Sequence, residues 1–264
     1  MSDYQLRFAG IARLYGVSAL ETFKAAHVCV VGIGGVGSWA AEALARSGIG
    51  TITLIDLDDV CISNINRQLH ALTDTIGQDK VAVMAARIKA INPDCVVHQI
   101  EDFVTTENLQ SLINKEMDYV VDAIDSIKAK TALLAHCKRN KIKVISTGGA
   151  GGQTDPTQIQ IADLTQTIND PLMAKVRNSL RRDYNYSRNP KRRFGIDCVF
   201  STEQLVYPQP DGSVCQQKTA QVNDSGEVTS MRLDCSGGFG AVTVVTASFG
   251  FAAVSRVLKK LAQR

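Results

Sequence analysis

The chain has 264 residues, a hydrophobic share of 45% and a formal net charge of +3. This length and composition predict one large domain or two small ones with a solid core, and the weak net charge by itself selects no class of partner. Its seven cysteines form no Cys-x-x-Cys pair, which argues against a structural zinc site and against a disulfide framework. The N-terminus has no signal-peptide pattern, so we expect a cytoplasmic protein.

The first 25 residues are typical of a helical arm. After them, short β-branched apolar runs alternate with helical segments as far as residue 147. The predicted strands are 27–32, 51–56, 95–100, 118–125 and 143–147, and the predicted helices are 38–50, 79–93 and 126–140. This alternation predicts an α/β fold, doubly wound and Rossmann-like, with a mostly parallel sheet.

The pattern changes after the glycine-rich segment 148–152. Two alternating runs, 157–164 and 195–201, are typical of further strands, and a basic helix is expected between them. We therefore predict a nucleotide-binding domain with its helical arm over 1–152. A C-terminal α+β extension over 153–264 would add antiparallel strands and continue the same globule.

Two segments of this extension have opposite character. The polar stretch 208–230 predicts a mobile loop. The stretch 236–255 contains no charged residue and is long enough to cross a bilayer. Its four glycines and several Ser and Thr residues make it only modestly apolar, so we expect a buried or dimer-interface helix without stable membrane insertion. Membrane association through 236–255 is the alternative, and a basic tail follows it.

A glycine-rich loop lies between the first predicted strand and the first predicted helix. It contains Gly32, Gly34, Gly35, Gly37 and Ser38 and satisfies Gly-x-Gly-x-x-Gly. Such a loop lets the backbone approach phosphates, which the helix N-terminus attracts. Asp56 ends the second strand nineteen residues after Gly37, where a carboxylate can accept ribose hydroxyls. These features predict a bound nucleotide, and the motif alone does not separate ATP from NAD.

The segment after the second strand favours ATP over a dinucleotide. Asp58, Asn64, Arg67 and Lys80 follow Asp56 within 24 residues. A triphosphate gains more than a dinucleotide from Arg and Lys side chains and from a metal ion. Asp125, at the end of the fourth predicted strand, is placed to hold Mg²⁺. Each of these residues alone could be an ordinary surface group or helix cap, but together they indicate ATP and argue against an NAD-dependent oxidoreductase.

The order of these motifs resembles the ubiquitin-activating superfamily. The motifs are Gly-x-Gly-Gly-Val-Gly-Ser, Leu-Ile-Asp-x-Asp-x-Val, Ser-Asn-x-x-Arg-Gln, Gly-Gln-x-Lys and Asp-Ala-Ile-Asp, within residues 5–165. The resemblance implies that Gly34, its neighbours and Asp56 hold the adenosine and phosphates. It places Asn64, Arg67 and Lys80 on the polyphosphate and Asp125 on Mg²⁺.

The same resemblance implies a homodimer in which an N-terminal arginine reaches the partner's ATP. Arg7 and Arg13 are both candidates, and the spacing does not choose between them.

The C-terminal part distinguishes between branches of the superfamily. Bacterial members that activate sulfur-carrier proteins usually carry two Cys-x-x-Cys pairs, which this chain lacks. Residues 175–203 and 232–251 instead resemble the branch that dehydrates threonylcarbamoyladenosine beside the anticodon of tRNA. That resemblance implies adenylation of a carboxylate with release of pyrophosphate, followed by ring closure with release of AMP. Two alternatives are adenylation of a carrier protein's C-terminus and a non-catalytic adaptor for a sulfur-relay protein.

A basic stretch suits a tRNA substrate. Between residues 175 and 193 there are eight Lys or Arg residues and one acid, Asp183. The candidate phosphate contacts are Lys175, Arg177, Arg181, Arg182, Arg188, Lys191, Arg192 and Arg193. Tyr184, Tyr186 and Phe194 are interleaved and could stack on unpaired bases. The alternative is a solvated basic helix face.

Two cysteines and two histidines carry weaker signals. Cys235 precedes the apolar helix, where a lowered thiol pKa could support a thioester, but a small buried residue before the Ser236 cap is the simpler interpretation. Cys29 is expected in the core. His27 and His70 lack ligand partners in the sequence, and we interpret both as structural.

Overall fold

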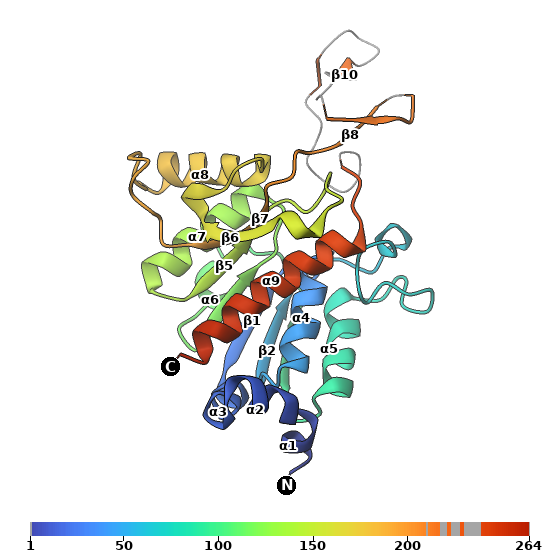
Figure 1. The fold of residues 1–264 in the computed structure, drawn as a ribbon, viewed down its shortest axis with the longest axis vertical. Helices are drawn as coiled ribbons and strands as arrows, with labels where there is room; N and C mark the ends of the chain where they lie inside the picture. Colours follow the sequence, from blue (N-terminus) through green and yellow to red (C-terminus); the bar gives the residue numbers. More distant parts are fainter. Residues whose placement is uncertain (1, 210, 217–220, 223–227, 230–238, 264) are drawn as a thin grey trace.

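A seven-stranded sheet forms the centre of the computed structural model, which describes residues 2–209, 211–216, 221–222, 228–229 and 239–263 (Figure 1). The strands are β1 (His27–Val31), β2 (Thr51–Ile55), β3 (Val96–Ile100), β4 (Tyr119–Asp122), β5 (Val144–Thr147), β6 (Ile159–Asp163) and β7 (Asp197–Ser201). Their order is β3-β2-β1-β4-β5-β7-β6, and only β6 runs antiparallel to its neighbour. The predicted Rossmann-like, mostly parallel sheet with an added antiparallel strand is confirmed.

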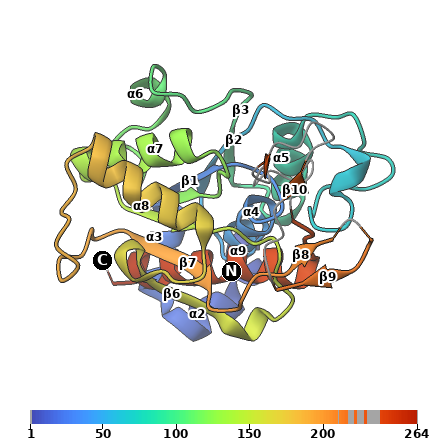
Figure 2. The ribbon, with the colours of Figure 1, turned by 90° about the horizontal axis from the view of Figure 1, so that it is seen from above.

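Helices cover both faces of the sheet. They are α1 (Asp3–Arg7), α2 (Ala9–Tyr15), α3 (Val17–Ala25), α4 (Gly37–Arg46), α5 (Lys80–Ile91), α6 (Leu109–Leu112), α7 (Ile127–Asn140), α8 (Pro171–Asp183) and α9 (Thr243–Leu261). One core cluster joins α3, α4, α5 and α9 to the sheet, and a second joins α6, α7 and α8 to its other face. Figure 2 shows α7 and α8 on the opposite side of the sheet from α9. Doubly wound packing of this kind leaves the carboxyl ends of the strands open for a ligand.

The C-terminal extension continues the same sheet. β7 pairs in parallel with β5, so that Ser146 lies opposite Cys198. β6 then closes the edge, with Ile161 opposite Val199. The division of the chain at residue 152 stays a prediction, since the two parts share a sheet.

Helix α9 differs in its bounds from the predicted apolar helix. It begins at Thr243 rather than 236, and it includes most of the predicted basic tail, ending at Leu261. It packs against α4 so closely that a Cβ on Gly250 would lie 2.7 Å from the Val36 carbonyl oxygen. Phe249 is fully buried in this contact region. Among the helices of the described residues, none has the length and hydropathy needed to span a membrane.

The predicted loop at 208–230 contains regular structure in its described part. β8 (Tyr207–Pro208) pairs with β9 (Val214–Cys215), and β10 (Gln221–Val222) pairs with β11 (Val228–Thr229), both antiparallel. The mobility of this segment stays a prediction.

Candidate functional site

A cavity of about 610 Å³ opens at the carboxyl ends of the central strands. Its size is typical of sites that hold a nucleotide-sized ligand. The predicted site residues that line it are Gly32, Gly34, Gly35, Asp56, Asp58, Asn64, Arg67, Lys80 and Asp125. The fold therefore brings together residues from three separate segments, which follow β1, β2 and β4, as the motif order predicts.

The glycines of the loop differ in the space that surrounds them. Gly32 has a φ of 86° and lies against the Ala123 carbonyl, so a side chain there would be strained and crowded. A Cβ on Gly37 would lie 1.7 Å from the Gly32 oxygen, which makes Gly37 essential for packing α4 onto the loop. A Cβ on Gly34 would meet only the far end of Gln68, at 3.8 Å, so this part of the loop faces open space.

Ser38 lies behind the loop instead of in the cavity. It is fully buried, and its hydroxyl donates to the Gly34 carbonyl at 2.7 Å. The Ser38 hydroxyl oxygen in turn accepts from the Leu69 amide at 3.3 Å. Gly37 and Ser38 do not line the cavity, so we expect them to shape the loop without contacting a ligand.

Asp56 connects the glycine loop to the end of β2. Its Oδ2 accepts from the Ile33 amide at 2.5 Å, and its Oδ1 accepts from the Asp58 amide at 2.9 Å. Because both bonds come from backbone groups at the rim of the cavity, they hold the carboxylate in position. The arrangement preorganises an acceptor for hydroxyl groups beside a phosphate-binding loop.

Two cations approach the cavity from the segment after β2. The Lys80 side chain is only 6% exposed, and its Nζ lies 2.7 Å from Oδ2 of Asp58, which is 55% exposed. Arg67 donates through Nη1 to the Ser63 carbonyl at 2.7 Å and to Asn66 Oδ1 at 3.1 Å. A guanidinium has five N–H donors, so Arg67 retains capacity for an anionic ligand.

Asn64 supports the turn that carries Arg67. It is buried, and its Oδ1 accepts from the Cys61 amide at 3.1 Å. This bond closes the 3₁₀ turn over Ile62–Asn64.

A buried ion pair shapes the loop that presents Asp125. Asp122 and Lys130 both have fully buried side chains, and Nζ lies 2.8 Å from Oδ2. Ser146 Oγ donates to the same carboxylate at 2.6 Å, and the Ile124 amide donates to Oδ1 at 3.2 Å. β4 ends at Asp122, three residues before the predicted end, so Asp125 is exposed in the loop before α7.

Asp170 is a cavity residue that the sequence analysis missed. It caps α8, accepting from the Met173 amide at 2.9 Å and from the Gly149 amide at 3.1 Å. Burial raises the pKa of its carboxyl group. The sequence signal was present, since an Asp directly before Pro171 is typical of a helix N-terminus. Its contact with the cavity could not be predicted, because it depends on the long-range approach of Gly149.

The sequence of this chain and the geometry of its cavity match a known protein family. The ThiF family model matches residues 6–264. The chain belongs to the ThiF family. The tRNA threonylcarbamoyladenosine dehydratase of Escherichia coli is 58% identical over 258 residues, which cover 98% of this chain and 94% of that protein. The Haemophilus influenzae protein of the same name is 56% identical over 264 residues, covering 100% and 96%.

A solved structure of the Escherichia coli dehydratase in complex with ATP resembles this ThiF family member closely. The TM-score is 0.85 at 54% identity, and the match covers 98% of this chain and 96% of that one. The predicted membership of the ubiquitin-activating superfamily, in its tRNA-modifying branch, agrees with these matches.

The basic stretch of this ThiF family member divides into internal and exposed cations. Arg177 donates to the Thr167 carbonyl at 3.0 Å, to the Leu164 carbonyl at 3.3 Å and to the Thr167 hydroxyl. Arg181 lies over the Phe194 ring at 5.6 Å. The Arg177 guanidinium is therefore engaged by internal oxygens, whereas Arg181 has only the ring contact. Phosphate contact by either arginine stays a prediction.

Of the three aromatic residues predicted to stack on bases, Phe194 is not available, and the two tyrosines are half-buried. Phe194 is buried, and Tyr186 packs edge-on against it with ring centroids 4.8 Å apart. Burial raises the pKa of Tyr186 to about 12. Tyr184 also packs against this core cluster. Stacking of Tyr184 or Tyr186 on unpaired bases stays a prediction.

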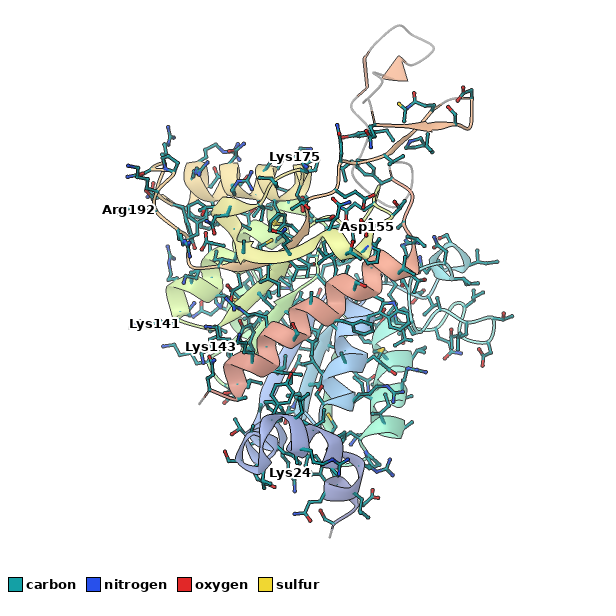
Figure 3. The ribbon with its side chains drawn as sticks, in the orientation of Figure 1. Lys24, Lys141, Lys143, Asp155, Lys175 and Arg192 are labelled. Carbon is teal, nitrogen blue, oxygen red and sulfur yellow. The ribbon has the colours of Figure 1, made fainter. Side chains whose placement is uncertain are left out.

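The remaining six cations of the stretch are exposed: Lys175, Arg182, Arg188, Lys191, Arg192 and Arg193. Arg182 forms an ion pair with Asp183 at 2.7 Å. Figure 3 shows Lys175 and Arg192 on the same upper face of the protein, at opposite ends of α8. The surface available to an anionic partner is therefore narrower than the sequence indicates.

Asp163 anchors the end of this basic stretch. Its Oδ2 accepts from the Gly195 amide at 2.7 Å and the Ile196 amide at 3.3 Å, and its Oδ1 accepts from the Phe194 amide at 3.1 Å and the Thr165 amide at 3.0 Å. Burial alone would raise the pKa of this carboxyl, but the hydrogen bonds outweigh burial and hold the pKa below its ordinary value.

Asp163→Ala is expected to lower the free energy of unfolding by about 2–4 kcal/mol, because it leaves backbone donors without their acceptor. A lowered native pKa means that the carboxylate stabilises the protein above about pH 4 and loses this effect as the pH falls through the native pKa. Urea unfolding at pH 7 and pH 3 tests both points. Asp155→Ala, which removes a more exposed cap, is the control and should cost less. Equal losses for the two variants would contradict the anchoring role.

Several predicted residues fall outside the cavity or outside the described residues. Cys235 and Ser236 lie outside the described part of the chain. Arg7 pairs with Asp3 at 2.6 Å, and Arg13 is exposed on the arm.

The structural roles expected for three other residues are confirmed. Cys29 is fully buried. His70 bonds the Ile33 carbonyl at 2.7 Å and His27 bonds Thr53 Oγ1 at 2.7 Å. Among the described residues of this ThiF family member, no three His, Cys, Asp or Glu side chains form a metal-binding group.

Proposed function

We propose that the protein catalyses the ATP-dependent dehydration of threonylcarbamoyladenosine in tRNA, closing a ring beside the anticodon. The observation that carries the proposal is a cavity lined by a glycine loop, two cations and two acidic loops, in a chain that matches dehydratases over nearly its whole length. An ATP complex of one such relative supports ATP as the co-substrate. Carrier-protein adenylation is the alternative, and the absence of Cys-x-x-Cys pairs disfavours it.

ATP would occupy the cavity with its phosphates over the glycine loop. The open side of Gly34 leaves space for phosphate oxygens, and the N-terminus of α4 favours their charge. Asp56 would accept ribose hydroxyls. Arg67 and Lys80 would bind the polyphosphate, with Asp58 holding Lys80 in position before ATP arrives.

The residues present fit a magnesium ion held partly by ATP. Asp125 is exposed at the cavity wall, and no complete ligand set surrounds it among the described residues. Mg²⁺ is commonly held by one or two carboxylates together with substrate phosphates and water. When bound, the ion would neutralise charge on the phosphates.

The reaction divides into two displacements. In the first, an oxygen of the substrate carboxylate attacks the α-phosphorus of ATP, and pyrophosphate leaves. In the second, the carbamoyl nitrogen attacks the activated acyl carbon, loses its proton, and expels AMP with that carboxylate oxygen. The protein's contribution is to hold the carboxylate in line with the leaving pyrophosphate and to stabilise the charge that develops on the phosphoryl group.

A homodimer is part of the same proposal. Large apolar side chains are exposed around the 3₁₀ turn and on α9, namely Ile62, Ile65, Val244 and Phe251. A monomer rarely exposes such groups together without a binding role. We propose that a second copy covers them and that Arg7 or Arg13 of the arm approaches the other copy's nucleotide. A cytoplasmic location and contact with a sulfur-relay protein remain further elements of the proposal.

Product analysis tests the function. Incubation with Mg-ATP and tRNA, followed by digestion, should convert threonylcarbamoyladenosine to a nucleoside lighter by one water and should form AMP and pyrophosphate in equal amounts. ATP–pyrophosphate exchange that requires a carrier protein and ignores tRNA would contradict the proposal.

A further inference from the structure

Two Lys- and Arg-rich segments that are far apart in the sequence meet on one flank of the protein. The first ends α7, where Lys138 Nζ donates to the Gly195 carbonyl at 3.0 Å. The second is the loop after α8, and α7 packs against α8. Figure 3 shows Lys141 and Arg192 on the same flank. We call this surface the cationic flank, and it comprises Arg139, Lys141, Arg188, Lys191, Arg192 and Arg193.

The charges of the cationic flank are exposed and unneutralised. All six side chains are exposed, and none joins an ion pair found within the described residues. Cations near the last turn of α7 have a local reason to be there, since they offset the helix dipole. The four from 188–193 belong to no helix, so that reason does not apply to them. Like charges gathered in this way favour a polyanion with regularly spaced charges.

Two sets of contacts anchor the backbone directly beside these charges. The Lys138 bond fixes the α7 end to Gly195, and Asp163 holds the amides of Phe194 to Ile196. A surface with fixed geometry loses less entropy on binding than a flexible tail.

The cationic flank lies too far from the cavity to touch the reacting nucleotide. α8 starts at the cavity, which Pro171 and Leu172 line, and it ends at Asp183. Thirteen helical residues span about 20 Å. Successive phosphates of a duplex strand advance about 3.4 Å along the helix axis, so the flank is several nucleotides away.

We infer that the cationic flank binds the phosphates of a base-paired stem in the same tRNA whose modified nucleoside enters the cavity. This inference rests on the proposed function and adds Arg139 and Lys141 of α7 to the tRNA contact. Stem phosphates supply affinity without reading bases, which suits an enzyme that acts on tRNAs of different sequence.

The test is a double variant, Arg139→Glu with Lys141→Asn. Lys141 has a φ of 60°, a conformation that Asn tolerates, so the change should preserve the fold. Filter binding of tRNA at several salt concentrations should give about tenfold weaker binding, with a salt slope shallower by about 2. A single-stranded oligonucleotide carrying the modified nucleoside, too short to form a stem, should bind the variant and the native protein equally.

The matched control is Lys89→Glu with Lys24→Asn. It removes the same charge from exposed positions on α5 and α3, and Figure 3 shows Lys24 far from the cationic flank. It should leave tRNA affinity unchanged, and ATP affinity should be unchanged in both double variants. Unchanged tRNA affinity in the Arg139/Lys141 variant would overturn the inference and leave the flank to a protein partner. Equal losses for tRNA and oligonucleotide would overturn the assignment to a stem. If native protein binds tRNA through the flank but leaves the nucleoside mass unchanged, the proposed function fails, and only the contact between the cationic flank and a tRNA stem stands.

Discussion

Replacing Arg67 with alanine is expected to lower kcat/KM for the adenylation step about 10³-fold. The hydrogen bonds of the Arg67 guanidinium found among the described residues use Nη1 alone, which leaves its other donors for phosphoryl oxygens. A planar fork of donors matches a phosphate better than a single ammonium does, so Arg67→Lys should recover only part of the loss. Steady-state kinetics with ATP as the varied substrate measure both variants.

The control for Arg67 is Arg46→Ala. Arg46 is an exposed residue that pairs with Glu42 at 2.7 Å near the end of α4, away from the cavity. Its loss should change kcat/KM by less than about threefold, because Arg46 does not line the cavity. If Arg67→Ala retained more than a tenth of the native kcat/KM, the clamp role would be wrong.

Lys130→Met is expected to lower the free energy of unfolding by about 3–5 kcal/mol, because it leaves the fully buried Asp122 carboxylate without its cation. For a chain of this size the melting temperature should fall by about 10 °C. The loop from Asp122 to Asp125 depends on the same carboxylate through the Ile124 amide, so ATP affinity should fall as well.

A double variant separates the ion pair from the side-chain volume. Lys130→Met with Asp122→Asn removes both charges and should recover at least about 1 kcal/mol relative to Lys130→Met alone. Lys128→Met, two residues earlier on α7 and exposed, is the control and should leave stability nearly unchanged. If Lys128→Met and Lys130→Met lowered the free energy of unfolding by similar amounts, the buried ion pair would have no special role in stability.

The central sheet and the glycine loop were predictable because their signals are local. A strand such as β1 is a short apolar run with turn residues on each side, and the glycine spacing directly records the steric limits at Gly32 and Gly37. The positions of Asp56 and Lys80 followed from the same motif order. Sequence patterns of this kind predict the local backbone conformation, because residues close together in the sequence determine that conformation.

The parts that could not be predicted depend on contacts between distant segments. The density of positive charge predicts that Arg177 contacts phosphate, but its guanidinium donates to the Thr167 carbonyl. Phe194 looked available for stacking because a linear sequence does not show which face of a loop packs on α7 and α8. Asp170 reaches the cavity only because Gly149 lies beside it.

Labelling the carboxylate of the threonylcarbamoyl side chain with a heavy oxygen isotope tests whether this carboxylate forms a bond to the α-phosphorus of ATP. Mass spectrometry of the products after one turnover with unlabelled ATP should find one heavy oxygen in the phosphate of AMP, because the carboxylate oxygen leaves with it. Unlabelled AMP, or label recovered in inorganic phosphate beside ADP, would contradict carboxylate adenylation in this cavity.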